Sequence, residues 1–281
     1  MITLLTPLKR VRLGVFLGAV FVVFCSVAPF IWIGIVSITP ESGQFRQHIS
    51  YLPQNPTLDN YIYMLKSYGF ARVFLNSTVV ATTTTLLAVA VSSLAAYSLA
   101  RFRFPGRQLL IVSLLLIYML PGLVLLLPMM VMFKTLGLLN TYAGLIIAEC
   151  THSIPYSVWM LTNYISTLPK DLEDSALVDG CTRVQAMMRI VMPLAVPGIV
   201  VTSLFVFIAS WNNFTFAYMF TSGENVRTLP VLLRLFVGGE AGVFWPSIMA
   251  SAVMTTLPVA TAFLFFQRYL MQGLAAGAVK G

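Results

Sequence analysis

Apolar residues fill six stretches of this chain, and each stretch is long enough to cross a bilayer as a helix. A transmembrane helix needs about 20 consecutive, mainly apolar residues. Arg72 and Glu149 are the only charged residues inside these stretches. The pattern predicts an all-α polytopic membrane protein in which residues 1–281 form a single domain. The predicted spans are residues 13–38, 72–100, 108–133, 142–165, 194–220 and 247–266.

The composition places the chain in lipid rather than in water. It is 58% apolar and only 9% charged, with a mean hydropathy of +0.88. A typical soluble domain is about 45–50% apolar and about 25% charged. So little charge cannot cover the surface of a water-soluble globule. We therefore expect a multi-pass protein of the cell membrane, surrounded by the lipid bilayer.

The positive charges indicate how the helices are oriented. A net charge of +8 would suggest nucleic acid in a soluble protein. Here the basic residues flank apolar stretches, so no nucleic-acid partner is expected. Cytoplasmic loops of membrane proteins carry an excess of Lys and Arg. With both termini in the cytoplasm, eleven of the 17 Lys and Arg residues lie inside, among them the cluster Arg101, Arg103 and Arg107. The pattern therefore predicts two cytoplasmic termini.

The segment of residues 168–198, between the fourth and fifth predicted spans, is unusually charged for this chain. Its first part holds four of the nine acidic residues: Asp171, Glu173, Asp174 and Asp179. Pro169 suits a first helical turn, and the helix dipole stabilises acidic residues near a helix N-terminus. We therefore predict a short cytoplasmic helix that begins near Pro169 and ends at about Val178.

A second helix is predicted after a glycine hinge. Gly180 can adopt the left-handed conformation that ends a helix. Thr182 and Gln185 have the spacing of a capping box, which predicts a helix over residues 183–191. We expect it to be broken before the fifth span by Pro193 and Pro197. A short helix exposed to water is marginal without packing, so an ordered helix here would dock on the bundle or on another subunit. The alternative is a solvated loop with incidental helix signals.

A recognisable spacing runs through this segment: Asp174-Ser175-Ala176, then Gly180, Ile190 and Pro193. It resembles the Glu-Ala-Ala loop of ABC importer permeases, with Asp and Ser replacing the first two residues of that motif. The runs NST at 76–78 and SWNNF at 210–214 are similar to motifs of the family's second and fifth spans. The ending QRYLMQGLAAGAVKG at 267–281 is similar to that of maltose-type carbohydrate permeases, and specifically to the shorter permease partner.

The resemblance implies a permease subunit of an ATP-driven ABC importer, with the type I permease fold. Such a subunit forms half of the translocation path for a carbohydrate: a disaccharide, an oligosaccharide or a related polyol. The implied partners are a second permease subunit, two ATP-binding subunits and an extracytoplasmic sugar-binding protein. In this family the loop forms a coupling helix that docks on the ATPase. The implied ATPase-coupling positions are Glu173, Asp174, Ser175, Ala176, Asp179 and Gly180, with Asp174 as a polar contact and Gly180 as a hinge.

The chain itself is expected to be neither an enzyme nor a nucleotide-binding protein. A phosphate-binding loop needs a Gly-Lys pair, and no Gly-Lys pair exists in this sequence. The resemblance implies that ATP and Mg²⁺ are used by the partner subunits. No cofactor is expected to be bound by this chain.

Polar residues inside the spans are candidates for the sugar path, because such residues usually face the interior of a bundle. The candidates are Glu149, His152, Trp211, Asn212 and Asn213. Glu149 and His152 are three residues apart and share a helix face. Interhelical hydrogen bonds, or for Glu149 a wet position near the outer interface, are the alternatives. A Glu-x-x-His pair also suggests a metal site, but two ligands are too few and no metal is expected.

Two other functions are consistent with a membrane location. A self-contained secondary transporter or channel would need a carboxylate in mid-membrane, and Glu149 is the only candidate. That function leaves the organised segment 168–198 unexplained. An intramembrane enzyme would need a nucleophile–base pair or a metal cluster in the spans, and neither is apparent in the sequence.

Overall fold

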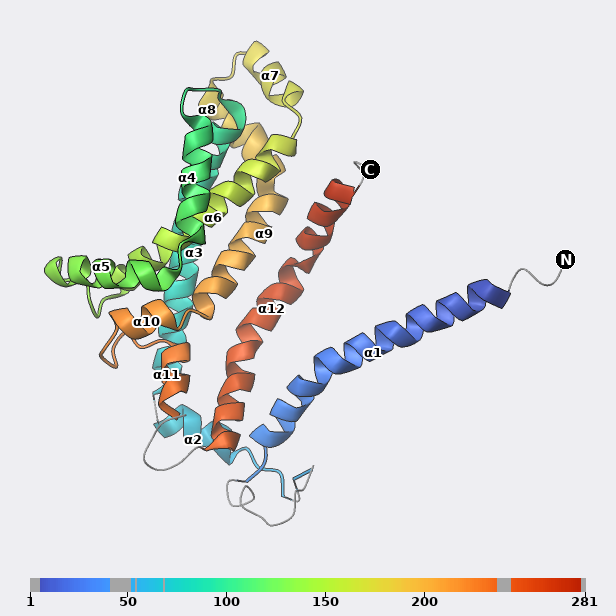
Figure 1. Cartoon of the computed structure of the whole chain (residues 1–281), viewed down its shortest axis with the longest axis vertical. Helices are drawn as coiled ribbons and strands as arrows, with labels where there is room; N and C mark the ends of the chain where they lie inside the picture. Colours follow the sequence, from blue (N-terminus) through green and yellow to red (C-terminus); the bar gives the residue numbers. More distant parts are fainter. Residues whose placement is uncertain (1–5, 41–51, 54, 68, 237–243, 279–281) are drawn as a thin grey trace. The chain divides into compact units, whose positions relative to one another are not determined.

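Every regular element is a helix in the computed structural model, within the residues that it describes: 6–40, 52–53, 55–67, 69–236 and 244–278 (Figure 1). The predicted all-α class is confirmed. The chain divides into two compact units, the first of Met1–Phe70 with Leu235–Leu257 and the second of Ala71–Arg234 with Pro258–Gly281.

The first unit holds α1 (Thr6–Ser37), α2 (Asp59–Ser67) and the first part of α12 (Trp245–Ala278). Hydrogen bonds join α2 to the C-terminal end of α1. The Asn60 side-chain amide donates to the carbonyl oxygens of Ser37 and Thr39, both at 2.9 Å. The Tyr61 hydroxyl lies 2.7 Å from the Ser37 hydroxyl. The bond to Ser37 O satisfies a carbonyl that the end of α1 leaves without an intrahelical partner.

The second unit holds most of the helices and all of the predicted site residues. Its helices are α3 (Phe70–Arg101), α4 (Arg107–Met119), α5 (Gly122–Thr135), α6 (Tyr142–Thr167), α7 (Asp171–Val178), α8 (Arg183–Ala186), the π-helical turn η2 (Met187–Val191), α9 (Met192–Trp211), α10 (Thr215–Phe220) and α11 (Leu229–Phe236).

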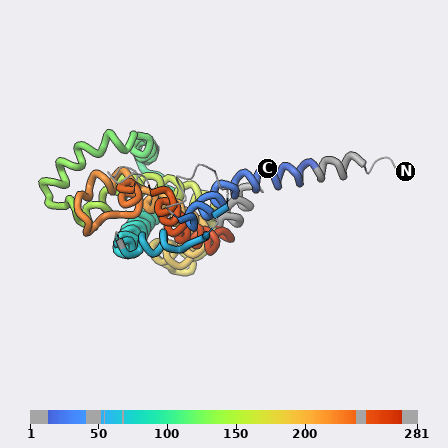
Figure 2. Tube along the Cα trace, turned by 90° about the horizontal axis from the view of Figure 1, so that it is seen from below, coloured from blue at the N-terminus to red at the C-terminus, as the bar shows by residue number. Residues whose placement is uncertain are grey.

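The third predicted span, residues 108–133, is not one straight helix. It consists of α4 and α5, which meet at an angle of 92°, so that α5 runs across the direction of α4 (Figures 1 and 2). Leu120 has an extended backbone with ψ of 133°. A residue before proline is pushed out of the helical region, and Pro121 therefore ends α4. The Pro-Gly pair at 121–122 was the local signal for this bend.

The predicted effect of the two prolines near residue 195 is wrong, because the helix continues through them. Residues 183–211 form α8, η2 and α9 without a break. Pro193 lies directly after the π-helical turn, so its missing N–H falls where the regular i→i−4 hydrogen bonds are already interrupted. The wider π-helical turn directly before it changes the hydrogen-bond register. The predicted fifth span, residues 194–220, instead breaks between α9 and α10.

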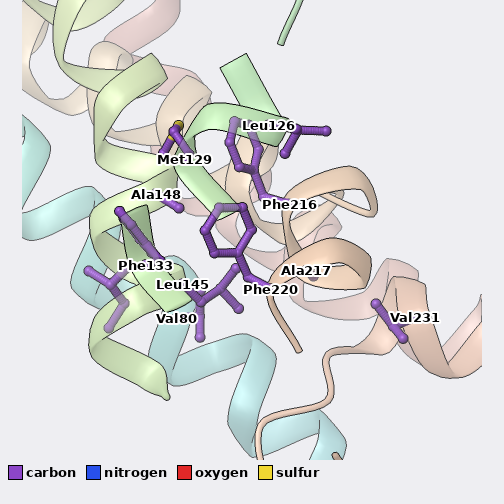
Figure 3. Close-up of a cluster of buried hydrophobic side chains, with 11 residues drawn as sticks. Val80, Leu126, Met129, Phe133, Leu145, Ala148, Phe216, Ala217, Phe220 and Val231 are labelled. Carbon is purple, nitrogen blue, oxygen red and sulfur yellow. The ribbon is translucent and has the colours of Figure 1, made fainter. Parts of the chain in front are cut away.

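Two apolar clusters hold the second unit together. One joins α5 and α10 to α6 and α3, with Leu126, Phe133, Leu145 and Phe220 nearly inaccessible to solvent (Figure 3). The other joins α3, α6, η2 and α9, and its members include Ala96, Leu161, Ile165, Met187 and Val191. The second cluster attaches the segment after Gly180 directly to the bundle.

The number of spans is only partly settled by helix length and composition. Within the described part, four helices are long and apolar enough to cross a membrane, or five if α4 and α5 count as one bent span. They belong to α1, α3, α8–α9 and α12, at the predicted first, second, fifth and sixth positions. The count of six, and the single domain over residues 1–281, remain predictions.

Candidate functional site

Helix α7 and the turn after it fold as the sequence predicts, with a small shift at the start of the helix. Helix α7 runs over Asp171–Val178, and Lys170 is its N-cap. Pro169 therefore lies just before the helix rather than in its first turn. The acidic residues Asp171, Glu173 and Asp174 lie in the first turn, where the helix dipole favours negative charge.

The turn after α7 is held by a complete set of capping bonds. Gly180 has a φ of +89°, which confirms the predicted left-handed conformation. The Gly180 amide donates to Leu177 O at 3.2 Å, and the Cys181 amide donates to Ala176 O at 2.9 Å. Together they form a Schellman motif. The predicted capping box is also confirmed, since Thr182 and Gln185 exchange side-chain and backbone hydrogen bonds at the start of α8.

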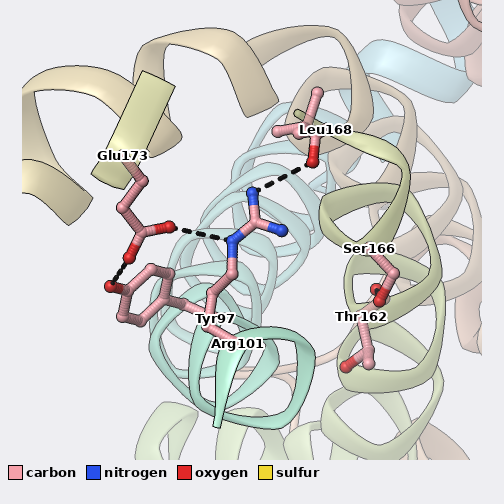
Figure 4. A network of polar contacts seen from close by, with 6 residues as sticks. All are labelled: Tyr97, Arg101, Thr162, Ser166, Leu168 and Glu173. Atoms are coloured by element: carbon pink, nitrogen blue, oxygen red, sulfur yellow. Dashed lines mark hydrogen bonds and ion pairs between the residues drawn. The ribbon is translucent and has the colours of Figure 1, made fainter. Parts of the chain in front are cut away.

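Glu173 anchors α7 to the end of α3. Its carboxylate accepts a hydrogen bond from the Tyr97 hydroxyl at 2.5 Å and one from Arg101 Nε at 2.9 Å (Figure 4). Arg101 Nη2 donates to Leu168 O, at the end of α6, at 3.3 Å. The three contacts join α3, α6 and α7 through one guanidinium and one carboxylate.

The ion pair between Arg101 and Glu173 is buried. The two side chains keep only 4% and 5% of their exposure, and Arg101 Nη1 is buried without a hydrogen-bond partner among the described residues. Removing one partner of such a pair strands a charge away from water, which costs about 3–5 kcal/mol. The anchor therefore resists being pulled apart, and α7 and α3 should move together.

Helix α8 is attached at the same end of the bundle. The Arg183 guanidinium lies 5.5 Å from the centre of the Phe102 ring, within the range of a cation–π interaction. Phe102 in turn packs edge-to-face against Tyr97, with ring centres 5.9 Å apart. Met187 and Val191 of η2 are buried in the apolar cluster beneath. The whole α7–α8–η2 segment is thus a rigid extension of the bundle, and not a solvated loop.

The six predicted ATPase-coupling residues face two directions. Glu173 and Ala176 point into the bundle and are buried, whereas Asp174, Ser175, Asp179 and Gly180 are exposed. The exposed side also carries apolar residues, with Val178 at 87% and Val184 at 65% of full exposure. The roles of these residues remain predictions, but the geometry separates an anchoring side from an outward side.

Sequence reasoning missed the partners of Glu173. Arg101 was interpreted only as a marker of orientation, and Tyr97 was not singled out. The two are four residues apart at the end of α3, so they lie on one helix face. A Tyr and an Arg on one face next to a charged loop were the available signal.

Glu149 is buried between three helices. Its carboxylate accepts hydrogen bonds from the Ser210 hydroxyl of α9 and, at 3.4 Å, from the Thr84 hydroxyl of α3. The side chain is 3% exposed. These are the interhelical hydrogen bonds of the alternative interpretation. A role of Glu149 in the sugar path remains a prediction.

The candidates of the fifth span do not gather around Glu149. Trp211 is buried and packs against the rings of Phe74 and Phe207, at 5.6 and 5.7 Å. The Asn212 side chain is exposed and donates to Ile208 O at 2.8 Å. Asn213 Oδ1 accepts a hydrogen bond from the Phe216 amide at 3.1 Å, just before α10 begins. Asn212 and Asn213 explain why α9 and α10 are separate helices, because Asn favours turns and caps.

His152, three residues after Glu149 on α6, lies against α4 instead of meeting the partners of Glu149. Its ring stacks on Tyr118 with centres 4.7 Å apart, and Tyr118 also packs on Tyr156 at 5.3 Å. The three rings line a cavity of about 180 Å³ between α4, α6 and α9. Glu149 does not line this cavity. Within the described residues, no group of three His, Cys, Asp or Glu side chains could hold a metal ion.

A polar cluster ties the opposite end of the second unit together. The Asn76 side-chain amide donates to the carbonyls of Asn225 and Arg227 at 3.0 and 2.8 Å. Its oxygen accepts from the Tyr142 hydroxyl at 2.6 Å, and the Ser77 hydroxyl accepts from the Leu229 amide at 2.8 Å. The NST run thus orders the segment that leads into α11.

Solved structures with a similar fold include a bacterial ABC transporter that imports the acidic polysaccharide alginate. One chain of its crystal structure matches with a TM-score of 0.74 at 21% identity, over 96% of this chain and 99% of that one. A second crystal structure, a bacterial alginate transporter in complex with a periplasmic protein bound to an alginate pentasaccharide, matches with a TM-score of 0.69 at 18% identity, over 94% and 95%. This likeness shows the fold.

Curated relatives extend over almost the whole chain. The trehalose/maltose transport system permease protein MalG of Thermococcus litoralis is 37% identical over 98% of this chain and 98% of its own length. The sulfoquinovosyl glycerol transport system permease protein SmoH of Agrobacterium fabrum is 34% identical over 95% and 93%. The trehalose transport system permease protein SugB of Mycobacterium tuberculosis is 35% identical over 92% and 94%. Residues 88–275 match the family described as binding-protein-dependent transport system inner membrane component, and the chain therefore belongs to that family of multi-pass membrane permeases.

Proposed function

We propose that this chain forms half of the translocation path of an ATP-driven importer for a carbohydrate delivered by an extracytoplasmic binding protein. Family membership supports the importer and its dependence on a binding protein. The carbohydrate is supported by the relatives, because MalG, SmoH and SugB are named for sugar transport. The other subunits of the importer are a second permease subunit and two ATP-binding subunits.

The proposal depends chiefly on the difference between the two sides of α7. Its inward side is locked to α3 by Glu173 and Arg101, and its outward side presents both acidic and apolar residues, with Val178 at 87% exposure. A short helix has little stability of its own, so an ordered, half-apolar helix in this position suits a docking partner. The partner is the ATP-binding subunit, with Asp174 as a polar contact and Val178 as an apolar one.

Force from ATP-driven closure passes through this docked helix into the bundle. The Glu173–Arg101 pair conveys it to α3, and η2 conveys it to α9 through Met187 and Val191. This chain only transmits the movement. It binds no nucleotide and catalyses no reaction, since ATP and Mg²⁺ are held by the partner subunits.

The α7 end of the bundle faces the cytoplasm in this proposal, and so do both termini. Arg101, Arg103 and Arg107 lie at that end, as the positive-inside rule requires. The opposite end, where Asn76 orders the segment after α10, faces outward and receives the binding protein. Glu149 then serves as an interhelical tie rather than as an ion-coupling carboxylate.

The test is the ATPase activity of the complete importer in lipid, with and without a sugar-loaded binding protein. Val178→Gln should remove most of the stimulation, because it places an amide in the docking surface without touching the buried anchor. Phe104→Gln is the matched control, since Phe104 is 40% exposed in the connection from α3 to α4 and lies outside α7. Equal stimulation of both variants would contradict the docking proposal.

A further inference from the structure

The cavity between α4, α6 and α9 has the features of a ligand site. Tyr118 comes from the last turn of α4, whereas His152 and Tyr156 lie four residues apart on α6, and Phe205 adds a wall from α9. The cavity reaches the surface, because Tyr118 and Phe205 keep 38% and 45% of their exposure. Small-molecule sites are concave, largely aromatic and supplied with a few polar groups.

The polar groups at this cavity have no partners in the described part of the protein. The imidazole of His152 and the hydroxyls of Tyr118, Tyr156 and Ser153 make no hydrogen bond to any described residue, although His152, Ser153 and Tyr156 are half-buried. The neighbouring polar side chains behave differently, since Ser157 and Thr151 both donate to backbone carbonyls of α6. The four polar groups around this cavity are accessible rather than buried without a partner, so they are free to bond to a ligand that supplies both donors and acceptors.

The ligand must also offer a flat apolar face. The stacked rings of Tyr118 and His152, inclined by 24°, form a platform about one ring wide. Benzene fits an enclosed cavity of about 150 Å³. This cavity measures about 180 Å³ and is open to the surface, so one six-membered ring can enter it with its substituents pointing outward. A pyranose ring has this combination, because its C–H face is apolar and its edge carries hydroxyls that donate and accept.

The scarcity of charged side chains in the lining narrows the class of ligand further. None of the residues that line the cavity is an Asp, Glu, Lys or Arg, so no permanently charged cation is present to pair with a carboxylate or a phosphate. An unpaired anion buried away from water is strongly disfavoured. The lining therefore selects a neutral ring over a uronic acid or a phosphorylated sugar.

We infer that Tyr118, His152, Ser153 and Tyr156 form a subsite on this chain for one neutral hexopyranose unit of the transported carbohydrate. The inference rests on the proposed function for the kind of ligand, and on the cavity for its place and its neutrality. Tyr118 and His152 supply the stacking platform, and the imidazole and the hydroxyls bond to the rim of the sugar ring.

The test is saturation-transfer NMR on the importer complex in nanodiscs without its binding protein, with maltose and trehalose as neutral probes and a uronic-acid disaccharide as the acidic probe. Saturation of the neutral ring C–H protons is expected, and none above background for the acid. Tyr118→Leu, which removes the platform, should lower the neutral signal about tenfold. His152→Phe, which keeps a stacking ring and loses the imidazole edge, should lower it several-fold.

The matched control is Trp159→Leu, which removes an exposed aromatic residue from the same helix, outside the cavity. It should leave the neutral signal unchanged. Equal signals in Tyr118→Leu and Trp159→Leu would overturn the subsite. Binding of the acidic probe to the same extent as the neutral probes would also overturn it. So would the absence of saturation of the neutral probes, which is the result expected if a lipid chain fills the cavity. ATP-dependent uptake by the same complex separates the two proposals. Uptake without saturation overturns only the subsite, whereas a complex that imports no carbohydrate overturns the proposed function as well.

Discussion

Replacing Glu173 with Ala should release α7 from the bundle while the rest of the chain stays folded. The change leaves the Arg101 guanidinium buried with Leu168 O as its one acceptor among the described residues. Breaking a buried pair in this way costs about 3–5 kcal/mol, and the Tyr97 hydroxyl also loses its acceptor, at about 1 kcal/mol. An eight-residue helix cannot offset this loss, since isolated helices shorter than about 12–15 residues are marginal in water.

The assay is hydrogen–deuterium exchange of the full chain in nanodiscs, followed on the peptide that contains α7. A loss of about 3–5 kcal/mol in the anchor corresponds to a rise of roughly 100- to 4,000-fold in the open population, at about 1.4 kcal/mol per factor of ten. Exchange of the α7 amides should accelerate accordingly, whereas amides of α6 should keep their protection. Asp171→Ala is the matched control, because Asp171 is exposed in the same helical turn.

A double substitution distinguishes the cost of an unpaired buried charge from a general destabilisation of the fold. Glu173→Leu combined with Arg101→Met removes both charges and leaves apolar side chains of similar length. Replacing both partners of a buried pair is often neutral, so the double variant should recover much of the protection that Glu173→Ala loses. Unchanged exchange in Glu173→Ala, or a double variant as open as the single one, would refute the anchor argument.

Three further changes probe the segments that support the site. Gly180→Val should strain the turn after α7 by about 1–3 kcal/mol, because φ is +89° there, and lower transport without reducing the amount of inserted protein on a membrane blot. Gly198→Ala should lower the thermal unfolding temperature of the purified chain, since a Cβ would lie 2.5 Å from the Tyr164 ring; an unchanged temperature would mean that α6 and α9 can separate at little cost. Asn76→Ala removes three hydrogen bonds at about 1 kcal/mol each, and proteolysis within the segment 221–228 should become faster than in wild type.

Local features of the site could be predicted from the sequence because their partners are close in the chain. The capping box of Thr182 and Gln185 spans three residues, and the turn at Gly180 depends on the conformational freedom of one residue. Acidic residues in a first helical turn mark a helix start for the same local reason. The family resemblance added a docking role to that segment, which local signals alone left open.

Contacts between distant residues could not be predicted in this way. Glu173 meets Arg101 across 72 residues, and nothing in the spacing of α7 says which of its three first-turn acids faces inward. The stack of Tyr118 on His152 likewise depends on how α4 packs against α6. Pairings of this kind are decided by helix packing, which one sequence without relatives does not reveal.

The predicted effects of two prolines on their helices were wrong, in opposite ways. Pro121 was passed over inside a predicted span, yet it ends α4, because Leu120 before it is forced into an extended conformation. Pro193 was expected to break a helix, yet the helix continues through it, because the π-helical turn directly before it already changes the hydrogen-bond register. The effect of a proline therefore depends on its position in the helix, and the sequence alone left that position uncertain by several residues.

The most direct test of the account is sided uptake in proteoliposomes that contain the complete importer. Labelled neutral oligosaccharide and its binding protein are supplied on one side, and ATP with Mg²⁺ is supplied on the side where an antibody detects a tag attached to the C-terminus of this chain. The account predicts uptake only when both are present on these opposite sides, with uptake abolished by Glu173→Ala and preserved in Asp171→Ala. Uptake driven by an ion gradient through this chain alone, without ATP or binding protein, would contradict it.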